Sequence, residues 1–159
     1  MIFATVGTQI PFPRMIESVR YAAERLDIDI VAQTIDMDYV YTPKGRLTCV
    51  KTVHPRNFQD LVAAADIIVS HAGIGSIISA ATASKPIILM PRQSQLYEHR
   101  NDHQMDTAKR FGSRRGIYIF NNGPELVDVL TAPLVPLAPI EPDMSPLITG
   151  IKSFIWNAS

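Results

Sequence analysis

A short glycine-containing segment of the sequence could bind an anion. Residues 70–76 read SHAGIGS, with Gly73 and Gly75 two positions apart. Glycines at this spacing allow a sharp turn and a close approach of the backbone to a ligand. A helix that begins at such a turn directs free N–H groups and a partial positive charge at the ligand, which suits a phosphate. The segment therefore predicts a phosphate site with Gly73, Gly75 and the Ser76 hydroxyl, beside His71; a plain strand–helix turn is the alternative.

A second segment, residues 91–104, is crowded with polar side chains and reads PRQSQLYEHRNDHQ. Arginine suits phosphate, and carboxylates and amides suit sugar hydroxyls. The side chains that we expect at a binding site here are Arg92, Glu98, His99, Asn101, Asp102 and Gln104. The alternative is a solvated helix N-terminus, with Asp102 facing the helix dipole.

Other chemistries fit these segments less well. His99 and His103 have a spacing that could bind a metal, but no third ligand is evident, and Asn101 and Asp102 resemble a helix start. We therefore expect no metal and no cofactor. The glycine turn is not the dinucleotide fingerprint, because Ile78 stands where the third glycine would be, and no P-loop sequence occurs.

The elements that would position these segments alternate along the chain. Apolar β-rich runs predict strands at residues 2–7, 28–34, 47–53, 66–70, 86–91 and 116–120. Helical periodicity or capping signals predict helices at residues 14–26, 57–65, 75–84, 102–111 and 123–131, the second of them capped by Asn57. This alternation predicts an α/β fold with a Rossmann-like, doubly wound parallel sheet. Ligands of such sheets lie beyond the carboxyl ends of the strands, so Gly7 and Thr8 should join the two segments there.

The last part of the chain has a different composition. Residues 1–132 fit one domain, whereas residues 133–159 begin as a proline-rich strap and continue as an apolar segment. A turn is predicted at residues 43–45, and Ser145 and Pro146 predict the start of a C-terminal helix. One side of that helix would carry Leu147, Ile148, Ile151, Phe154 and Ile155. This apolar side could cover the domain's own sheet or meet a partner.

Composition narrows the function further. The 159 residues are 47% hydrophobic and carry a formal net charge of zero, so we expect a globular chain that does not bind nucleic acid through bulk charge. Cys49 is the only cysteine, which excludes a disulfide framework. No signal peptide or membrane-spanning run is evident. These features predict a cytoplasmic protein.

The motifs taken in order resemble the donor-binding half of GT-B glycosyltransferases. IFATVGTQ, DIIVSHAGIGSI, KPIILMPR and EHRNDHQ resemble glycosyltransferase family 28 across roughly residues 2–130. The closer resemblance is to its split enzymes, in which a small subunit pairs with a membrane-anchored one. Examples are the dolichol-linked UDP-GlcNAc transferase and the PssE-type subunits of exopolysaccharide assembly.

This resemblance implies a UDP-sugar donor, with the diphosphate at Gly73, Gly75 and Ser76 and the sugar near Asn101, Asp102 and Gln104. It also implies a lipid-linked acceptor and a catalytic base supplied by the membrane-anchored partner, with this chain at the inner face of the membrane. Many relatives place a ribose-binding glutamate where Ser79 stands. A serine cannot accept two hydrogen bonds in the way a carboxylate does. This departure keeps a non-catalytic scaffold subunit as an alternative, and a free-standing nucleotide-binding enzyme is a further one.

Overall fold

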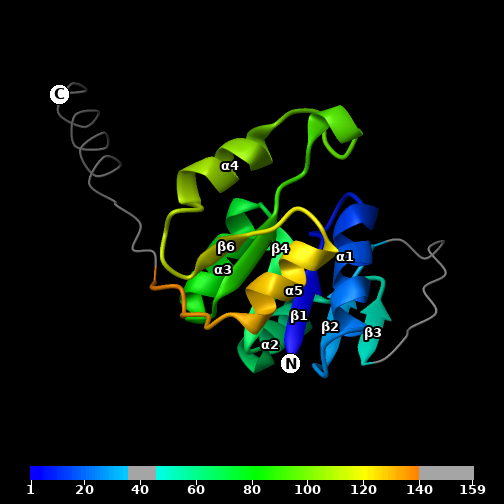
Figure 1. Ribbon diagram of the computed structural model, residues 1–159, viewed down its shortest axis with the longest axis vertical. Helices are drawn as coiled ribbons and strands as arrows, with labels where there is room; N and C mark the ends of the chain where they lie inside the picture. The colour runs from blue at the N-terminus through cyan, green and yellow to red at the C-terminus, as the bar shows by residue number, and fades with distance from the viewer. Residues whose placement is uncertain (36–45, 140–159) are drawn as a thin grey trace, which may run out of the picture.

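A six-stranded parallel sheet forms the centre of the computed structural model, which describes residues 1–35 and 46–139 (Figure 1). The strands are β1 (Ile2–Thr5), β2 (Ile30–Gln33), β3 (Leu47–Val50), β4 (Ile67–His71), β5 (Ile87–Met90) and β6 (Ile117–Ile119). Their order in the sheet is β3-β2-β1-β4-β5-β6. The predicted Rossmann-like architecture is confirmed.

The central strands are apolar because both of their faces are covered. Every residue of β1 and of β5 is buried. Within the sheet, Ile2 is paired in register with Ile30 of β2 on one side and with Ile67 of β4 on the other. Parallel strands covered on both faces favour such continuous apolar runs.

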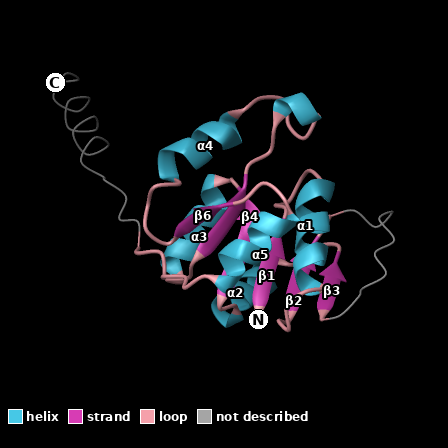
Figure 2. Ribbon diagram, in the orientation of Figure 1, coloured by secondary structure: helices cyan, strands magenta, loops and turns pink. Residues whose placement is uncertain are grey.

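Helices cover both faces of the sheet (Figure 2). The helices are α1 (Pro13–Ala23), α2 (Pro55–Ala64), α3 (Ile74–Thr82), α4 (His103–Phe111) and α5 (Gly123–Thr131). One core joins α1 and α5 to the sheet through residues such as Met15 and Leu126. The other core joins α2 and α3 to the opposite face through residues such as Val62 and Ile77. No helix of the described residues is long and apolar enough to cross a membrane.

The start of α2 corrects one sequence-based prediction. Asn57 was expected to cap this helix, but the helix begins two residues earlier, at Pro55. His54 is the cap, and its Nδ1 accepts a hydrogen bond from the Arg56 N–H at 3.3 Å. Proline is favoured at the first helical position because its missing N–H has no partner there.

The first part of the proline-rich strap packs against the domain. Residues 133–139 form no helix or strand. Leu137 is fully buried in the core beside α2 and α3, and its N–H donates to the Lys85 carbonyl at 3.4 Å. Leu134 packs against the other core, on the α1 and α5 side. The predicted turn at residues 43–45 and the predicted C-terminal helix lie outside the described residues.

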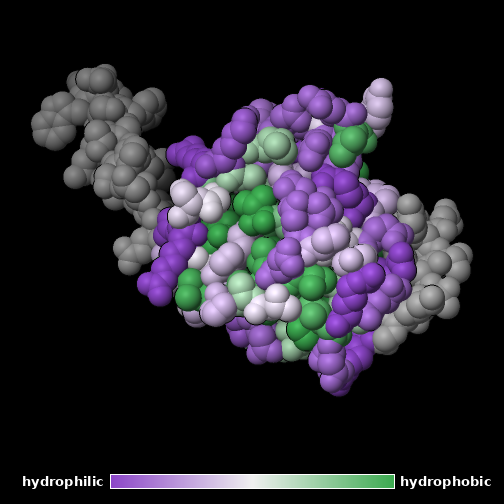
Figure 3. All heavy atoms as spheres, in the orientation of Figure 1, coloured by the Kyte–Doolittle hydropathy of each residue, from purple (hydrophilic) through white to green (hydrophobic). Residues whose placement is uncertain are grey.

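The carboxyl ends of the strands point toward the top of Figure 1, where α4 and the loop before it lie. That loop contains a short 3₁₀ turn, η1 (Ser94–Leu96), which the sequence did not predict. In the view of Figure 3, the rim formed by α4 and this loop is largely hydrophilic. This polar edge carries the segments that the sequence analysis selected.

Candidate functional site

The turn after β1, at Gly7 and Thr8, lies at the centre of the candidate site. Gly7 has a φ of +92°, in the region that glycine adopts without strain. Its N–H donates to the Thr5 hydroxyl at 3.2 Å, and that hydroxyl donates to the Gln33 side chain at 2.8 Å. Thr5 and Gln33 are both buried. These hydrogen bonds hold the backbone turn at Gly7 and Thr8 in place at the carboxyl edge of the sheet.

His71, the last residue of β4, lies between two glycines. A Cβ placed on Gly7 would approach the ring Cε1 to 2.8 Å, and one placed on Gly73 would overlap the ring. The pKa of His71 is lowered to about 4, mainly by burial and secondarily by the nearby Arg92 charge, while a hydrogen bond with the Thr5 backbone acts in the opposite direction. The imidazole is thus neutral at pH 7, so one ring nitrogen donates a hydrogen bond and the other can accept one.

The glycine turn leads directly into α3. Gly73 is the N-cap, and Gly75 lies in the first turn with no atom within 4 Å of where its Cβ would be. Ser76 accepts a hydrogen bond from Ser70 at 2.8 Å. The Ser79 hydroxyl donates to the Gly75 carbonyl at 3.0 Å. The predicted helix N-terminus therefore faces open space at Gly75, where N–H groups without intrahelical partners can meet an anion.

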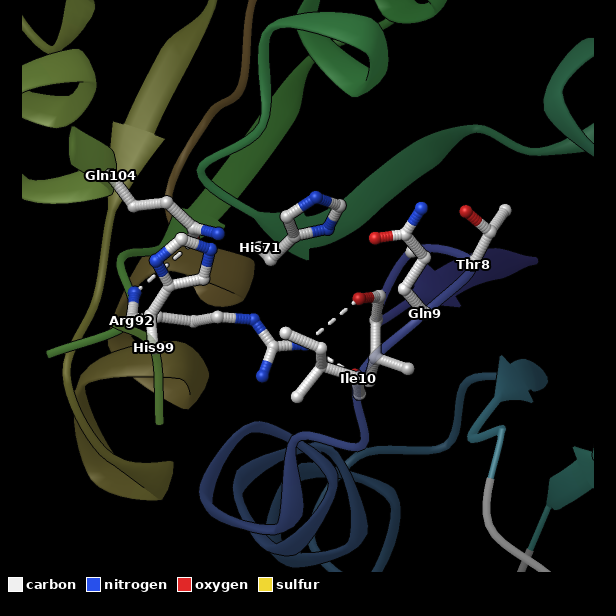
Figure 4. A pocket seen from close by; sticks show the side chains of 9 residues that line it. Thr8, Gln9, Ile10, His71, Arg92, His99 and Gln104 are labelled. Atoms are coloured by element: carbon white, nitrogen blue, oxygen red, sulfur yellow. Dashed lines mark hydrogen bonds between the residues drawn. The ribbon is translucent and has the colours of Figure 1, made fainter. Parts of the chain in front are cut away.

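Two adjoining cavities open at this edge and share Gly7, Thr8 and His71. The cavity beside α3 has a volume of about 310 Å³ and is lined by Thr5, Gly7, Thr8, Phe58, His71, Gly75, Ser76 and Ser79. The cavity beside the polar loop has a volume of about 150 Å³ and is lined by Val6, Gly7, Thr8, Gln9, Ile10, His71, Arg92, His99 and Gln104. Figure 4 shows His71 between the loop after β1 and the group formed by Arg92, His99 and Gln104.

Arg92 borders the smaller cavity, but its guanidinium is engaged by the protein itself. The residue is only 2% exposed. It donates to the carbonyls of Val6, Ile10 and Pro11 at 3.0, 2.6 and 2.7 Å, and more weakly to that of Glu98 at 3.4 Å. Burial lowers its pKa to about 10, so the group stays charged at neutral pH. A phosphate would have to compete with these carbonyls for the same donors.

Glu98 is likewise engaged inside the chain. Its carboxylate receives two hydrogen bonds from Arg14, at 2.6 and 2.7 Å, and one from the Gln93 N–H at 3.0 Å. Its side chain is 11% exposed. Arg14 lies in α1, far from Glu98 in the sequence, and no local pattern indicates this pairing. The Glu98 carboxylate therefore has a structural role and is not free to bind a sugar hydroxyl.

The remaining polar residues divide into two groups. His99 and Gln104 line the smaller cavity, and Gln104 accepts a hydrogen bond from the Arg92 N–H at 3.2 Å. Asn101 is exposed and is within 3.0 Å of the His99 ring nitrogen Nδ1. Asp102 accepts from the Ser94 N–H at 2.9 Å, and this bond holds the pKa of the carboxyl below its usual range. Asp102 is also the N-cap of α4, at the predicted helix start.

The structure thus brings together most of the expected residues. Those that line the two cavities are Gly7, Thr8, His71, Gly75, Ser76, Ser79, Arg92, His99 and Gln104. Gly73 packs against His71, whereas Glu98, Asn101 and Asp102 line neither cavity.

Five lining residues were not selected from the sequence: Thr5, Val6, Gln9, Ile10 and Phe58. Gln9 and Ile10 directly follow Thr8 and could have been included from their place after a strand. Phe58 lies within α2, where an apolar residue gives no functional signal. Within residues 1–35 and 46–139, no three histidine, cysteine, aspartate or glutamate side chains lie close enough to hold a metal ion.

These features define a class of protein. The six-stranded Rossmann-like parallel sheet with its helices matches the halves of GT-B glycosyltransferases. The sequence gives the family: residues 1–121 match the glycosyltransferase family 28 C-terminal domain, and the chain belongs to this family.

Solved structures agree on the fold. MurG from Acinetobacter baumannii is 18% identical, with a TM-score of 0.62 over 81% of this chain and 40% of MurG. The NMR structure of ALG13 is 16% identical, with a TM-score of 0.60 over 92% of this chain and 93% of ALG13. The glycosyltransferase VinC, solved in complex with dTDP, is 19% identical, with a TM-score of 0.55.

The lengths of these proteins differ. The chain spans 33% of a kitacinnamycin glycotransferase and 40% of MurG, which is less than half of either, but nearly the full length of ALG13. No curated protein sequence matches the chain.

Proposed function

We propose that this chain is the donor-binding subunit of a two-component glycosyltransferase. It would bind a UDP-sugar and, with a membrane-anchored partner, transfer the sugar to a lipid-linked acceptor in polysaccharide biosynthesis. The observation that carries the proposal is the open space at Gly75, in the first turn of α3, next to a cavity with serine hydroxyls and a neutral histidine. Membership of the family 28 C-terminal domain supports the glycosyltransferase class.

The arrangement suits the departure of a nucleoside diphosphate. The bond between the sugar's anomeric carbon and the diphosphate oxygen breaks as an acceptor hydroxyl attacks and gives up its proton. Negative charge then collects on the leaving diphosphate. Free N–H groups at the start of α3 and the Ser76 hydroxyl could stabilise that charge. The base that takes the proton would come from the partner, which would also hold this chain at the inner face of the membrane.

One observation favours a second candidate, a non-catalytic subunit with a weakened donor site. The Ser79 hydroxyl donates to the Gly75 carbonyl within its own helix. The Ser79 oxygen could still accept a hydrogen bond from one ribose hydroxyl, whereas a glutamate could accept hydrogen bonds from two.

The two candidates are separated by binding and transfer. UDP should raise the melting temperature of the purified chain, because a ligand that binds only the folded state stabilises it. Transfer from a labelled UDP-sugar into the lipid extract should then require both this chain and membranes that contain the partner. Binding without transfer would support the non-catalytic subunit. Transfer by the purified chain alone would contradict the two-component proposal.

The tail can be tested separately for its role in finding the partner. A chain that ends after Pro139 keeps the packing of Leu134 and Leu137, whereas one that ends after residue 132 loses it. We expect the longer truncated chain to bind UDP but no longer associate with the membranes. Unchanged association would assign the partner contact to the domain itself.

A further inference from the structure

Three side chains form an internal clasp next to the candidate site: Arg14, Arg92 and Glu98. Arg92 extends from the loop after β5 into the loop after β1, where it reaches the carbonyls of residues 6, 10 and 11. Figure 4 shows this side chain running beneath the cavity toward Ile10. A buried guanidinium is costly unless its donors are satisfied, and here backbone carbonyls of two separate loops satisfy them.

The Arg14–Glu98 pair joins the same two parts of the chain from the other side. The pair is bidentate, with the Glu98 oxygens 2.6 and 2.7 Å from two nitrogens of Arg14. Arg14 also donates to the Pro91 carbonyl at 2.9 Å. The Phe12 ring contacts both guanidinium groups, whose central carbons lie 5.3 Å (Arg14) and 4.3 Å (Arg92) from its centroid.

The clasp fixes the walls of the smaller cavity relative to each other. One wall is the loop after β1, with Thr8, Gln9 and Ile10; the other carries His99 and Gln104. The backbone N–H of Arg92 also binds the Gln104 side-chain oxygen at 3.2 Å. Because that bond occupies the amide oxygen, it orients the amide nitrogen of Gln104 as a donor.

We propose that the clasp is a positioning device for the sugar end of the donor, and that Arg92 acts through the cavity walls instead of binding the phosphate. The inference rests on the proposed function, because it assigns a task within the same donor site. The larger cavity, beside α3, would hold the nucleoside diphosphate without the clasp. Loss of the clasp should then weaken recognition of the sugar and leave recognition of UDP intact.

The test compares two affinities in each variant. Calorimetry would measure the dissociation constants of UDP and of the best-bound member of a panel of UDP-glucose, UDP-galactose and UDP-N-acetylglucosamine. We would use Arg92→Lys, Arg14→Lys and Glu98→Gln. Lysine keeps the charge but cannot span separate carbonyls as the planar guanidinium does. Arg20→Lys is the matched control, because Arg20 pairs with Glu17 and Glu24 on the surface of the same helix as Arg14.

We expect the ratio of the UDP-sugar constant to the UDP constant to rise about tenfold in the clasp variants, as for the loss of one good hydrogen bond. UDP affinity should stay within about threefold of wild type, and Arg20→Lys should change neither constant. If Arg92→Lys does not fold, the two variants of the partly exposed Arg14–Glu98 pair still decide the matter.

Two results would overturn the inference while leaving the proposed function standing. An unchanged ratio in the folded variants would make the clasp purely structural. A loss of UDP affinity in Arg92→Lys with an unchanged ratio would make Arg92 a phosphate ligand. A wild-type chain that binds neither UDP nor any UDP-sugar would overturn the proposed function and this inference with it.

Discussion

The glycine turn after β4 and the polar loop after β5 differ in how they use their polar groups. In the turn, Gly75 faces open space, and the helix that begins there has free N–H groups. In the loop, Arg92 and Glu98 are almost fully engaged by other parts of the chain. The segment with fewer polar side chains is therefore the one more open to a ligand.

This difference shows what a polar cluster can mean. Arginine and glutamate can bind a donor, but the same donors and acceptors can also hold two loops together. Which use applies depends on partners distant in sequence, such as Arg14 for Glu98. Backbone N–H groups at a helix start, in contrast, are available wherever the helix begins.

A substitution at Gly75 should have the largest effect. The structure has room for a side chain there, so Gly75→Val should fold but fill the space proposed for the diphosphate. We expect UDP affinity to fall at least a hundredfold, a loss of about 2.7 kcal/mol or more. Calorimetric titration would measure it, and Ile78→Val, on the exposed side of the same helix, is the control. UDP binding equal to wild type would remove the diphosphate from this turn.

Glu98→Ala should show the opposite pattern, a loss of stability with little loss of UDP affinity. The change leaves Arg14 and the Gln93 N–H without their carboxylate partner. We expect a fall of about 1–3 kcal/mol in the free energy of unfolding, measured with urea. If UDP affinity falls and stability does not, Glu98 is a ligand and the contrast between the two regions fails.

Acid should destabilise the chain through His71. The pKa of this histidine falls from 6.5 to about 4 on folding, so the unfolded chain binds more protons between these two values. The contribution of His71 to the free energy of unfolding is therefore fully present above pH 6.5 and is lost as the pH falls toward 4. We expect a loss of about 1–2 kcal/mol, after allowance for the partial exposure of the side chain. Urea unfolding of wild type and His71→Asn at pH 7 and pH 4.5 would measure it. An equal pH dependence in both would contradict a neutral His71.

The smallest effects are expected at Gln104 and Asn101. Gln104→Ala and Asn101→Ala should slow sugar transfer by the assembled enzyme and leave UDP affinity unchanged. Each should raise the activation free energy of transfer by about 0.5–1.5 kcal/mol, as expected for the loss of one hydrogen bond. Gln104 lines the smaller cavity but Asn101 does not, so the first variant should have the larger effect. Loss of UDP binding in both, with sugar selectivity retained, would reverse the roles of the two regions. EDTA should have little effect on transfer; strict metal dependence would favour a metal bound by His99 and His103.

The sequence predicted the architecture well because alternating apolar strands and helices have few other arrangements. The glycine turn and the N-cap of α4 at Asp102 were also visible as local patterns. The capping of α2 by His54 was missed, because histidine is not among the usual caps. The clasp was missed because it depends on contacts between residues far apart in the sequence, such as Arg92 and Pro11, which are 81 positions apart.

The most direct test of the account is a UDP titration of the ¹⁵N-labelled chain, followed residue by residue with NMR. We expect the largest amide shifts at Gly7, Thr8 and residues 73–79, around the larger cavity. Smaller shifts should appear at His99 and Gln104 until a UDP-sugar replaces UDP. Shifts centred on residues 91–102, with the glycine turn unchanged, would contradict the assignment of the nucleotide to α3.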